Sequence, residues 1–123
     1  MRTLVSDVLE RKNLRWWMNA AINAKIIADS EGHILLVNPA AEQLFGYTQE
    51  ELAARTVEDL IPQRLRALHA KQRADYAAYP SSRMMGTDLE IYGLRKDGSE
   101  FAADISLNPI ENGLVLATVY DIT

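Results

Sequence analysis

Apolar residues along the stretch 61–83 recur with the 3.6-residue period of an α-helix, so they share one side of the predicted helix. The apolar positions on this side are Leu65, Leu68, Tyr76 and Tyr79. His69 and Gln72 fall on the same side. The opposite side carries charged residues: Arg64, Lys71, Arg73 and Asp75. The pattern predicts one long helix that ends at Pro80 and packs its apolar side, with His69 turned inward, against the rest of the chain.

Beyond residue 83 the repeat changes to a period of two, which is typical of β-strands. It predicts three strands, at 88–96, 100–108 and 113–122, joined by turns at Asp97-Gly98 and Asn112-Gly113. The last strand is apolar on both faces, so both faces of the sheet should be covered. We expect the long helix on one face and an amino-terminal helix on the other.

The stretch between residues 24 and 60 predicts a β-hairpin followed by short helices. Two apolar runs, 25–29 and 33–38, are joined by Ser30-Glu31-Gly32, which is typical of a hairpin connection. A helix over 39–45 should begin after Asn38, a favoured N-cap, and end at Gly46. A capping box at 48–51 predicts a second helix, and 56–60 predicts a further helical turn. With the three later strands, the hairpin gives a five-stranded antiparallel sheet.

Residues 1–23 are predicted to form a separate amino-terminal helix, ahead of a main domain over 24–123. Trp16 and Trp17 point about 100° apart on a helix, so both are buried only if the helix has neighbours on more than one side. We therefore expect residues 1–23 to cap the domain and to form a homodimer contact together with the outer face of the sheet. The alternative is a helix that packs on its own domain alone.

Composition and charge exclude several classes of protein. The chain of 123 residues is one domain in size, and the absence of cysteine excludes disulfides, thiol catalysis and thiolate metal sites. The net charge is −4 without a basic stripe interleaved with aromatic residues, so we expect no nucleic-acid partner. No apolar run has the length of a membrane span and no signal peptide is recognisable, so we expect a cytoplasmic location without membrane contact.

The carboxylate pairs of this chain predict helix capping rather than catalysis. Glu50 with Glu51, and Glu58 with Asp59, are adjacent in sequence and lie near predicted helix starts, where the helix dipole favours acidic residues. No Ser-His-Asp arrangement and no phosphate-binding glycine loop is recognisable. We therefore expect that the chain is not an enzyme.

The order of elements and six short motifs resemble those of PAS domains. The motifs are Asp29-x-x-Gly32-x-Ile34, Asn38-Pro39-Ala40-Ala41-Glu42, Leu44-Phe45-Gly46-Tyr47, Glu50-Glu51-Leu52, Arg95-Lys96-Asp97-Gly98 and Asp121-Ile122-Thr123. The resemblance spans residues 25–123. It implies an α+β fold with helices packed on one face of a five-stranded antiparallel sheet. It also implies a regulatory sensory module of a histidine kinase, a cyclase or phosphodiesterase, or a chemoreceptor, with an effector domain after Thr123.

The resemblance places a candidate ligand site between the long helix and the sheet. The residues expected to form it are His69, Gln72, Leu65, Tyr76 and Val119. His69 lies where the haem-binding PAS oxygen sensors carry their proximal ligand, so the resemblance implies haem b as a candidate cofactor with His69 on the iron. The distal arginine and methionine of those sensors are replaced by Leu89 and Thr87.

Two alternatives stay open for this site and for the module. His69 is either an iron ligand or a hydrogen-bonded histidine of the core. The module either binds a small molecule or cofactor and relays the change through a dimer, or it is a ligand-free dimerisation and interaction module. The sequence names no other cofactor and does not identify the ligand.

Overall fold

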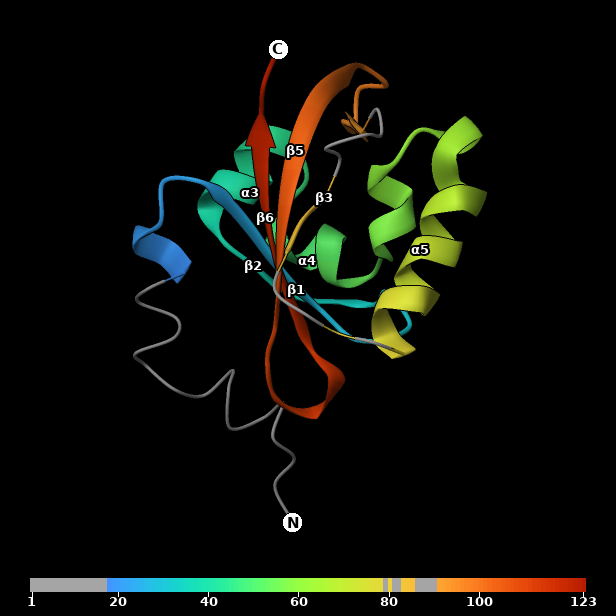
Figure 1. Ribbon diagram of the computed structural model, residues 1–123. Helices are drawn as coiled ribbons and strands as arrows, with labels where there is room; N and C mark the ends of the chain where they lie inside the picture. Colours follow the sequence, from blue (N-terminus) through green and yellow to red (C-terminus); the bar gives the residue numbers. More distant parts are fainter. Residues whose placement is uncertain (1–17, 79, 81–82, 86–90) are drawn as a thin grey trace.

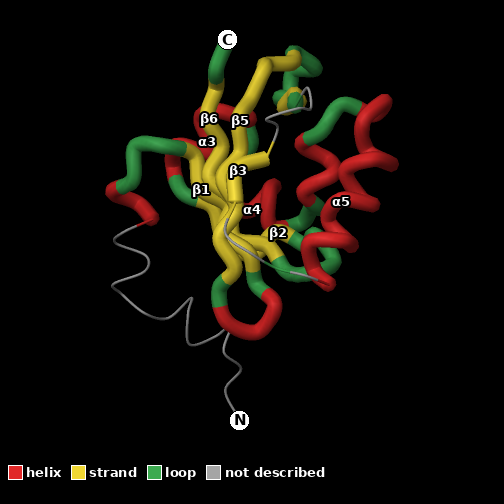
Figure 2. Tube along the Cα trace, viewed as in Figure 1, coloured by secondary structure: helices red, strands yellow, loops and turns green. Residues whose placement is uncertain are grey.

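An antiparallel β-sheet forms the centre of the computed structural model, which describes residues 18–78, 80 and 91–123 and the backbone of 83–85. The strands are β1 Ala24–Ala28, β2 Ile34–Val37, β3 Arg83–Met85, β4 Tyr92–Leu94, β5 Glu100–Pro109 and β6 Val115–Asp121. Their order is β2-β1-β6-β5-β3, with β4 also paired to β5 (Figures 1 and 2). The first and the last strand in the sequence, β1 and β6, are therefore neighbours at the centre of the sheet.

Strands β3 and β4 share one edge position of the sheet, because both pair with β5. Met85 is opposite Ile105, and Tyr92 is opposite Ala102. Met85 and Tyr92 are seven residues apart in the sequence, whereas their partners on β5 are only three residues apart. The six strand segments thus occupy five positions, which confirms the predicted five-stranded antiparallel sheet. The predicted strand 88–96 is β4 alone within the described residues.

The short helices begin and end where local side chains predict. They are α3 Pro39–Phe45, α4 Gln49–Ala53 and the 3-10 turns η1 Val57–Leu60 and η2 Gln63–Leu65. Asn38 caps α3 by accepting a hydrogen bond from Ala41 N, and Gly46 ends it in the left-handed conformation with φ 82°. Thr48 and Glu51 form both hydrogen bonds of the capping box of α4. These three predictions are confirmed.

The predicted long helix is shorter than expected, because α5 covers only Arg66–Ala78. Ile61 and Pro62 are extended, with ψ of 137° and 142°. A residue that precedes proline is biased away from helical angles, which explains why the helix cannot begin at residue 61. Leu68 was predicted on the buried side, but it is 51% exposed. The inward side of α5 instead follows the spacing i, i+3, i+4, i+7 from residue 69 to residue 76.

The short helices and the longer helix α5 lie on one face of the sheet (Figure 1). Residues 18–23, the described part of the amino-terminal segment, begin on the other face. On the helix face Phe45, Leu52 and Phe101 pack into one apolar cluster with strand residues. On the opposite face Met18 packs with Ile27 and other apolar side chains. Residues 1–17, including both tryptophans, lie outside the described residues, so the dimer contact and the boundary at residue 23 stay predictions. None of the helices described is long and apolar enough to cross a membrane.

Candidate functional site

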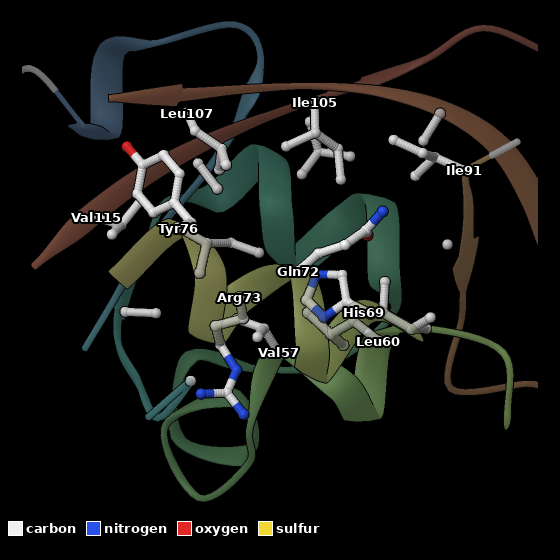
Figure 3. Close-up of a pocket in the computed structure, with 18 of the residues that line it drawn as sticks. Val57, Leu60, His69, Gln72, Arg73, Tyr76, Ile91, Ile105, Leu107 and Val115 are labelled. Atoms are coloured by element: carbon white, nitrogen blue, oxygen red, sulfur yellow. The ribbon is translucent and has the colours of Figure 1, made fainter. Parts of the chain in front are cut away.

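A cavity of about 110 Å³ lies between α5, η1 and the helix face of the sheet (Figure 3). Its wall is mostly apolar and is formed by Ile26, Ala28, Phe45, Val57, Leu60, Ile61, Ile91, Ile105, Leu107, Val115, Ala117 and Val119. Helix α5 contributes the polar side chains His69, Gln72, Arg73 and Tyr76. The strand residues alternate along β5 and β6, because every second side chain of a strand points to the same face.

Four of the five residues proposed from the sequence line this cavity. They are His69, Gln72 and Tyr76 from α5 and Val119 from β6. Leu65 lies in η2, before α5 begins, and is not among the described residues that line the cavity. Its placement follows from the late start of α5, because a 3-10 turn does not continue the helical face.

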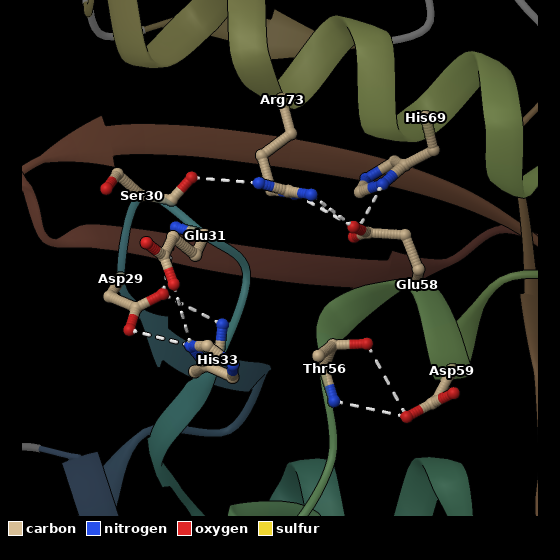
Figure 4. A network of polar contacts seen from close by, with 9 residues as sticks. All are labelled: Asp29, Ser30, Glu31, His33, Thr56, Glu58, Asp59, His69 and Arg73. Atoms are coloured by element: carbon tan, nitrogen blue, oxygen red, sulfur yellow. Dashed lines mark hydrogen bonds and ion pairs between the residues drawn. The ribbon is translucent and has the colours of Figure 1, made fainter.

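Arg73 was predicted on the solvated side of the helix, but the structure turns it inward onto Glu58 (Figure 4). Arg73 Nε and Nη2 lie 2.9 and 2.7 Å from Glu58 Oε1, and Arg73 Nη1 donates to Ser30 O at 2.9 Å. His69 Nδ1 lies 3.2 Å from Glu58 Oε2. The Glu58 side chain is only 15% exposed. Its negative charge is therefore stabilised by Arg73 and His69 of α5 rather than by water. These contacts fasten α5 to η1 and to the β1–β2 hairpin.

The sequence of η1 explains why Glu58 is available to α5. Asp59 accepts a hydrogen bond from Thr56 N at 3.1 Å and so caps η1, as predicted for this carboxylate pair. Glu58 is not the capping residue, because neighbours on a helical turn point in different directions. The prediction that both acids act as caps is therefore wrong for Glu58. Residues 58 and 73 are fifteen positions apart, so no local pattern in the sequence predicts that they contact each other.

His69 is neutral at pH 7, because burial lowers its pKa below the usual 6.5. The Glu58 carboxylate acts in the opposite direction and raises the pKa of His69, but burial, with a smaller contribution from the Arg73 charge, outweighs it. With Nδ1 facing the Glu58 carboxylate, the hydrogen-bond pattern assigns the proton of the neutral ring to Nδ1. The unprotonated Nε2 then remains as an acceptor on a ring that lines the cavity. No group of three metal-binding side chains occurs among the described residues.

The lowered pKa of His69 predicts that acidification weakens the fold between pH 7 and pH 5. The unfolded chain takes up this proton near pH 6.5, whereas the folded chain takes it up at lower pH, so the free energy of unfolding falls as the pH drops through this window. Urea unfolding followed by circular dichroism at pH 7.5, 6.5 and 5.5 measures the effect. The variant His69→Asn should lose this part of the pH dependence.

His33→Asn is the matched control, because it removes the other histidine, which lies exposed at the β1–β2 hairpin. In His33→Asn the free energy of unfolding should still fall with decreasing pH as in wild type, whereas in His69→Asn it should not. Four carboxyls have a pKa that hydrogen bonds hold below the ordinary value, and they therefore stay ionised throughout the window: Glu51, Asp97, Glu100 and Asp121. A wild-type protein that gains stability on going from pH 7.5 to pH 5.5 would contradict the burial of a neutral His69.

Comparisons with known proteins agree with this geometry. The family model described as PAS fold matches residues 13–122. An uncharacterized protein of Azorhizobium caulinodans is 34% identical over 124 residues, which cover 98% of this chain and 16% of that protein. Sensor protein FixL of Bradyrhizobium diazoefficiens is 29% identical over 101 residues, covering 82% of this chain and 20% of FixL.

Solved structures share the same architecture. A domain of the sensory box sensor histidine kinase/response regulator from Geobacter sulfurreducens has a TM-score of 0.74 at 22% identity, and the match covers 98% of each chain. At this identity the likeness establishes the fold alone. This chain spans a fifth or less of the length of the two relatives above, so it corresponds to one part of each of them.

Proposed function

This chain belongs to the PAS family, and from that premise we propose that it is the sensory module of a signal-transduction protein and binds a small molecule under α5. The observation that carries the proposal is the cavity itself. Protein interiors are close-packed, and an empty volume of about 110 Å³ costs about 2–3 kcal/mol at about 24 cal/mol per Å³. A core with a purely structural role would gain stability by filling this space, so its retention favours a ligand site.

The relay that we propose runs through β6. Val115 and Val119 line the cavity, and the same strand continues to Asp121 at the carboxyl-terminal end of the chain (Figure 1). A ligand that packs against α5 more tightly in one arrangement than in another shifts the population toward that arrangement. Because β6 contacts the ligand site and reaches the end of the domain, it carries the change toward an effector domain and a partner subunit. We propose a cytoplasmic, non-catalytic role for the module itself.

A ligand-free interaction module is the second candidate function. It is favoured by the half-buried apolar side chains of Leu35, Ile110 and Leu116, which pack against the buried cluster on the face opposite α5. Such a face suits a homodimer contact with the amino-terminal helix. The two candidates differ in what they require of the cavity, because the interaction module has no use for the empty volume.

Haem b, the cofactor that the family resemblance implies, does not fit the cavity as the structure shows it. His69 meets one requirement, because an axial histidine usually holds a carboxylate or carbonyl with its second ring nitrogen, as His69 does with Glu58. The second requirement is space for the macrocycle, and a cavity of about 110 Å³ does not provide it. Pockets for drug-sized ligands measure about 300–1,000 Å³, and haem is a larger molecule. Arg73, the cation that could meet a haem propionate, is already engaged by Glu58 and Ser30.

Filling the cavity tests the proposed function. Ala117→Leu adds three carbon atoms at a residue that lines the cavity. We expect its free energy of unfolding to stay within about 1 kcal/mol of wild type or to rise, whereas the same change in a filled core costs about 1–3 kcal/mol. Binding of small apolar molecules, followed by the NMR shifts of α5 and β6 amides, should be lost in this variant.

Ala77→Leu is the matched control, because it adds the same atoms on the exposed side of α5 and should leave binding unchanged. A variant Ala117→Leu that still binds the same molecules would contradict the site, and wild-type protein that binds none of them would favour the interaction module. Hemin added to wild type and to His69→Ala is a further arm. A visible absorption band that forms with wild type and is lost with His69→Ala would show that the cavity opens for haem.

A further inference from the structure

The charged groups around the cavity satisfy one another. The Arg73 guanidinium donates from Nε to Glu58 and from Nη1 to Ser30 O, and its Nη2 forms an ion pair with the same Glu58 oxygen. The second oxygen of Glu58 lies against His69. Asp29 also lines the cavity, but its carboxylate accepts hydrogen bonds from the backbone of Glu31 and His33. No unpaired positive charge is therefore left on the described wall to attract an anion.

The groups that remain open toward the cavity are neutral. Gln72 lines the cavity, and its side-chain amide has no hydrogen bond within the described part of the chain. Figure 3 shows this amide extended toward Ile105 and Ile91, whereas the Arg73 guanidinium turns to the other side. His69 Nε2 supplies a second neutral acceptor. An amide offers both a donor and an acceptor, so a single polar group on a ligand can pair with it.

We propose that the ligand of this cavity is a small, uncharged and mostly apolar molecule whose single hydroxyl group donates to His69 Nε2 and pairs with the Gln72 amide. This inference rests on the proposed function and specifies its ligand class. A carboxylate group would have to leave water without gaining an opposite charge, because Arg73 is already engaged by Glu58 and Ser30, and this is strongly unfavourable. An ammonium group would meet only Asp29, whose carboxylate already accepts hydrogen bonds from the backbone of Glu31 and His33. The volume sets the size, because an engineered cavity of about 150 Å³ in another protein holds benzene.

Three molecules of similar size test the ligand class at pH 7.5: phenol is neutral with a hydroxyl group, toluene is neutral without one, and benzoate is an anion. Each is titrated into the protein while the NMR shifts of cavity residues are followed. We expect phenol to bind about threefold to tenfold more tightly than toluene, the gain of one net hydrogen bond of about 0.5–1.5 kcal/mol. Benzoate should cause no saturable shift.

Gln72→Leu removes the amide while keeping a side chain of similar size. We expect the affinity for phenol to fall to that for toluene, with the affinity for toluene unchanged or increased. Gln43→Leu, an exposed position on α3, is the matched control and should leave both affinities unchanged. If Gln72→Leu leaves the preference for phenol intact, the role of the amide is overturned.

The outcomes separate this inference from the function on which it rests. Benzoate binding more tightly than phenol at the cavity residues would overturn the neutral ligand class and leave the ligand site standing. Toluene binding as tightly as phenol would overturn the polar anchor in the same way. If none of the three molecules shifts the cavity residues in a saturable manner, the ligand site itself is overturned, and the inference falls with it.

Discussion

Replacing Gly93 by alanine should lower the free energy of unfolding by about 3 kcal/mol or more, at the upper end of what overpacking costs. A Cβ atom at this position would lie 2.2 Å from Cζ and 2.5 Å from Cε1 of Phe101, its direct partner across β4 and β5. Phe101 has little room to move aside. The Phe45 ring lies 5.5 Å away between centroids, and the Arg95 guanidinium covers the Phe101 ring at 4.6 Å.

Urea unfolding followed by circular dichroism measures the effect of Gly93→Ala. The matched control is Gly98→Ala, because Gly98 has a φ of 89° but nothing within 4 Å of an added Cβ, so it measures backbone strain without a collision. We expect the control to cost about 1 kcal/mol. Adding Phe101→Leu to Gly93→Ala should restore part of the loss, because the two positions are in direct contact. A loss below about 1 kcal/mol for Gly93→Ala would contradict this packing.

Replacing Asn38 by alanine should lower the free energy of unfolding by about 3 kcal/mol. The side chain is fully buried, and its Oδ1 accepts hydrogen bonds from Ala41 N at 3.0 Å and from Lys25 N at 2.9 Å. Its Nδ2 donates to Asn23 O at 2.9 Å. Losing an N-cap costs about 1 kcal/mol, and each buried group left without its partner adds about 1–3 kcal/mol before relaxation.

Thr48→Ala separates the capping contribution of Asn38 from its role between α3 and β1. Thr48 is an exposed N-cap of the neighbouring helix α4, so its loss should cost only about 1 kcal/mol. Asn38→Ser keeps a capping oxygen but is too short to replace the whole set of bonds, and we expect a loss between those of the two alanine variants. If Asn38→Ala proved no more destabilising than Thr48→Ala, the contacts with β1 would contribute nothing measurable.

The candidate site was predictable from the sequence where a repeat defines a face. His69, Gln72 and Tyr76 share a helical spacing and Val119 follows the alternation of β6, and the family resemblance indicated that these two faces meet at a ligand site. Arg73 was missed because a charged residue is normally solvated, and its inward position depends on Glu58, fifteen residues earlier in the chain. The part of the apolar wall that lies on β5 and β6 could have been predicted from the same alternation.

The sequence by itself determined the elements whose hydrogen bonds close within about four residues. The caps at Asn38 and Thr48 and the left-handed Gly46 lie where the residue types require them, because each depends on its immediate neighbours. The motifs that these elements carry were enough to identify the PAS family.

Only the tertiary structure decided which parts meet. It left Leu68 exposed, turned Arg73 onto Glu58, paired both β3 and β4 with β5 and brought Gly93 against Phe101. These features depend on side-chain volume and charge supplied by segments that are distant in the sequence. No local repeat encodes such contacts, because the free energy of packing belongs to the pair of surfaces and not to either segment alone.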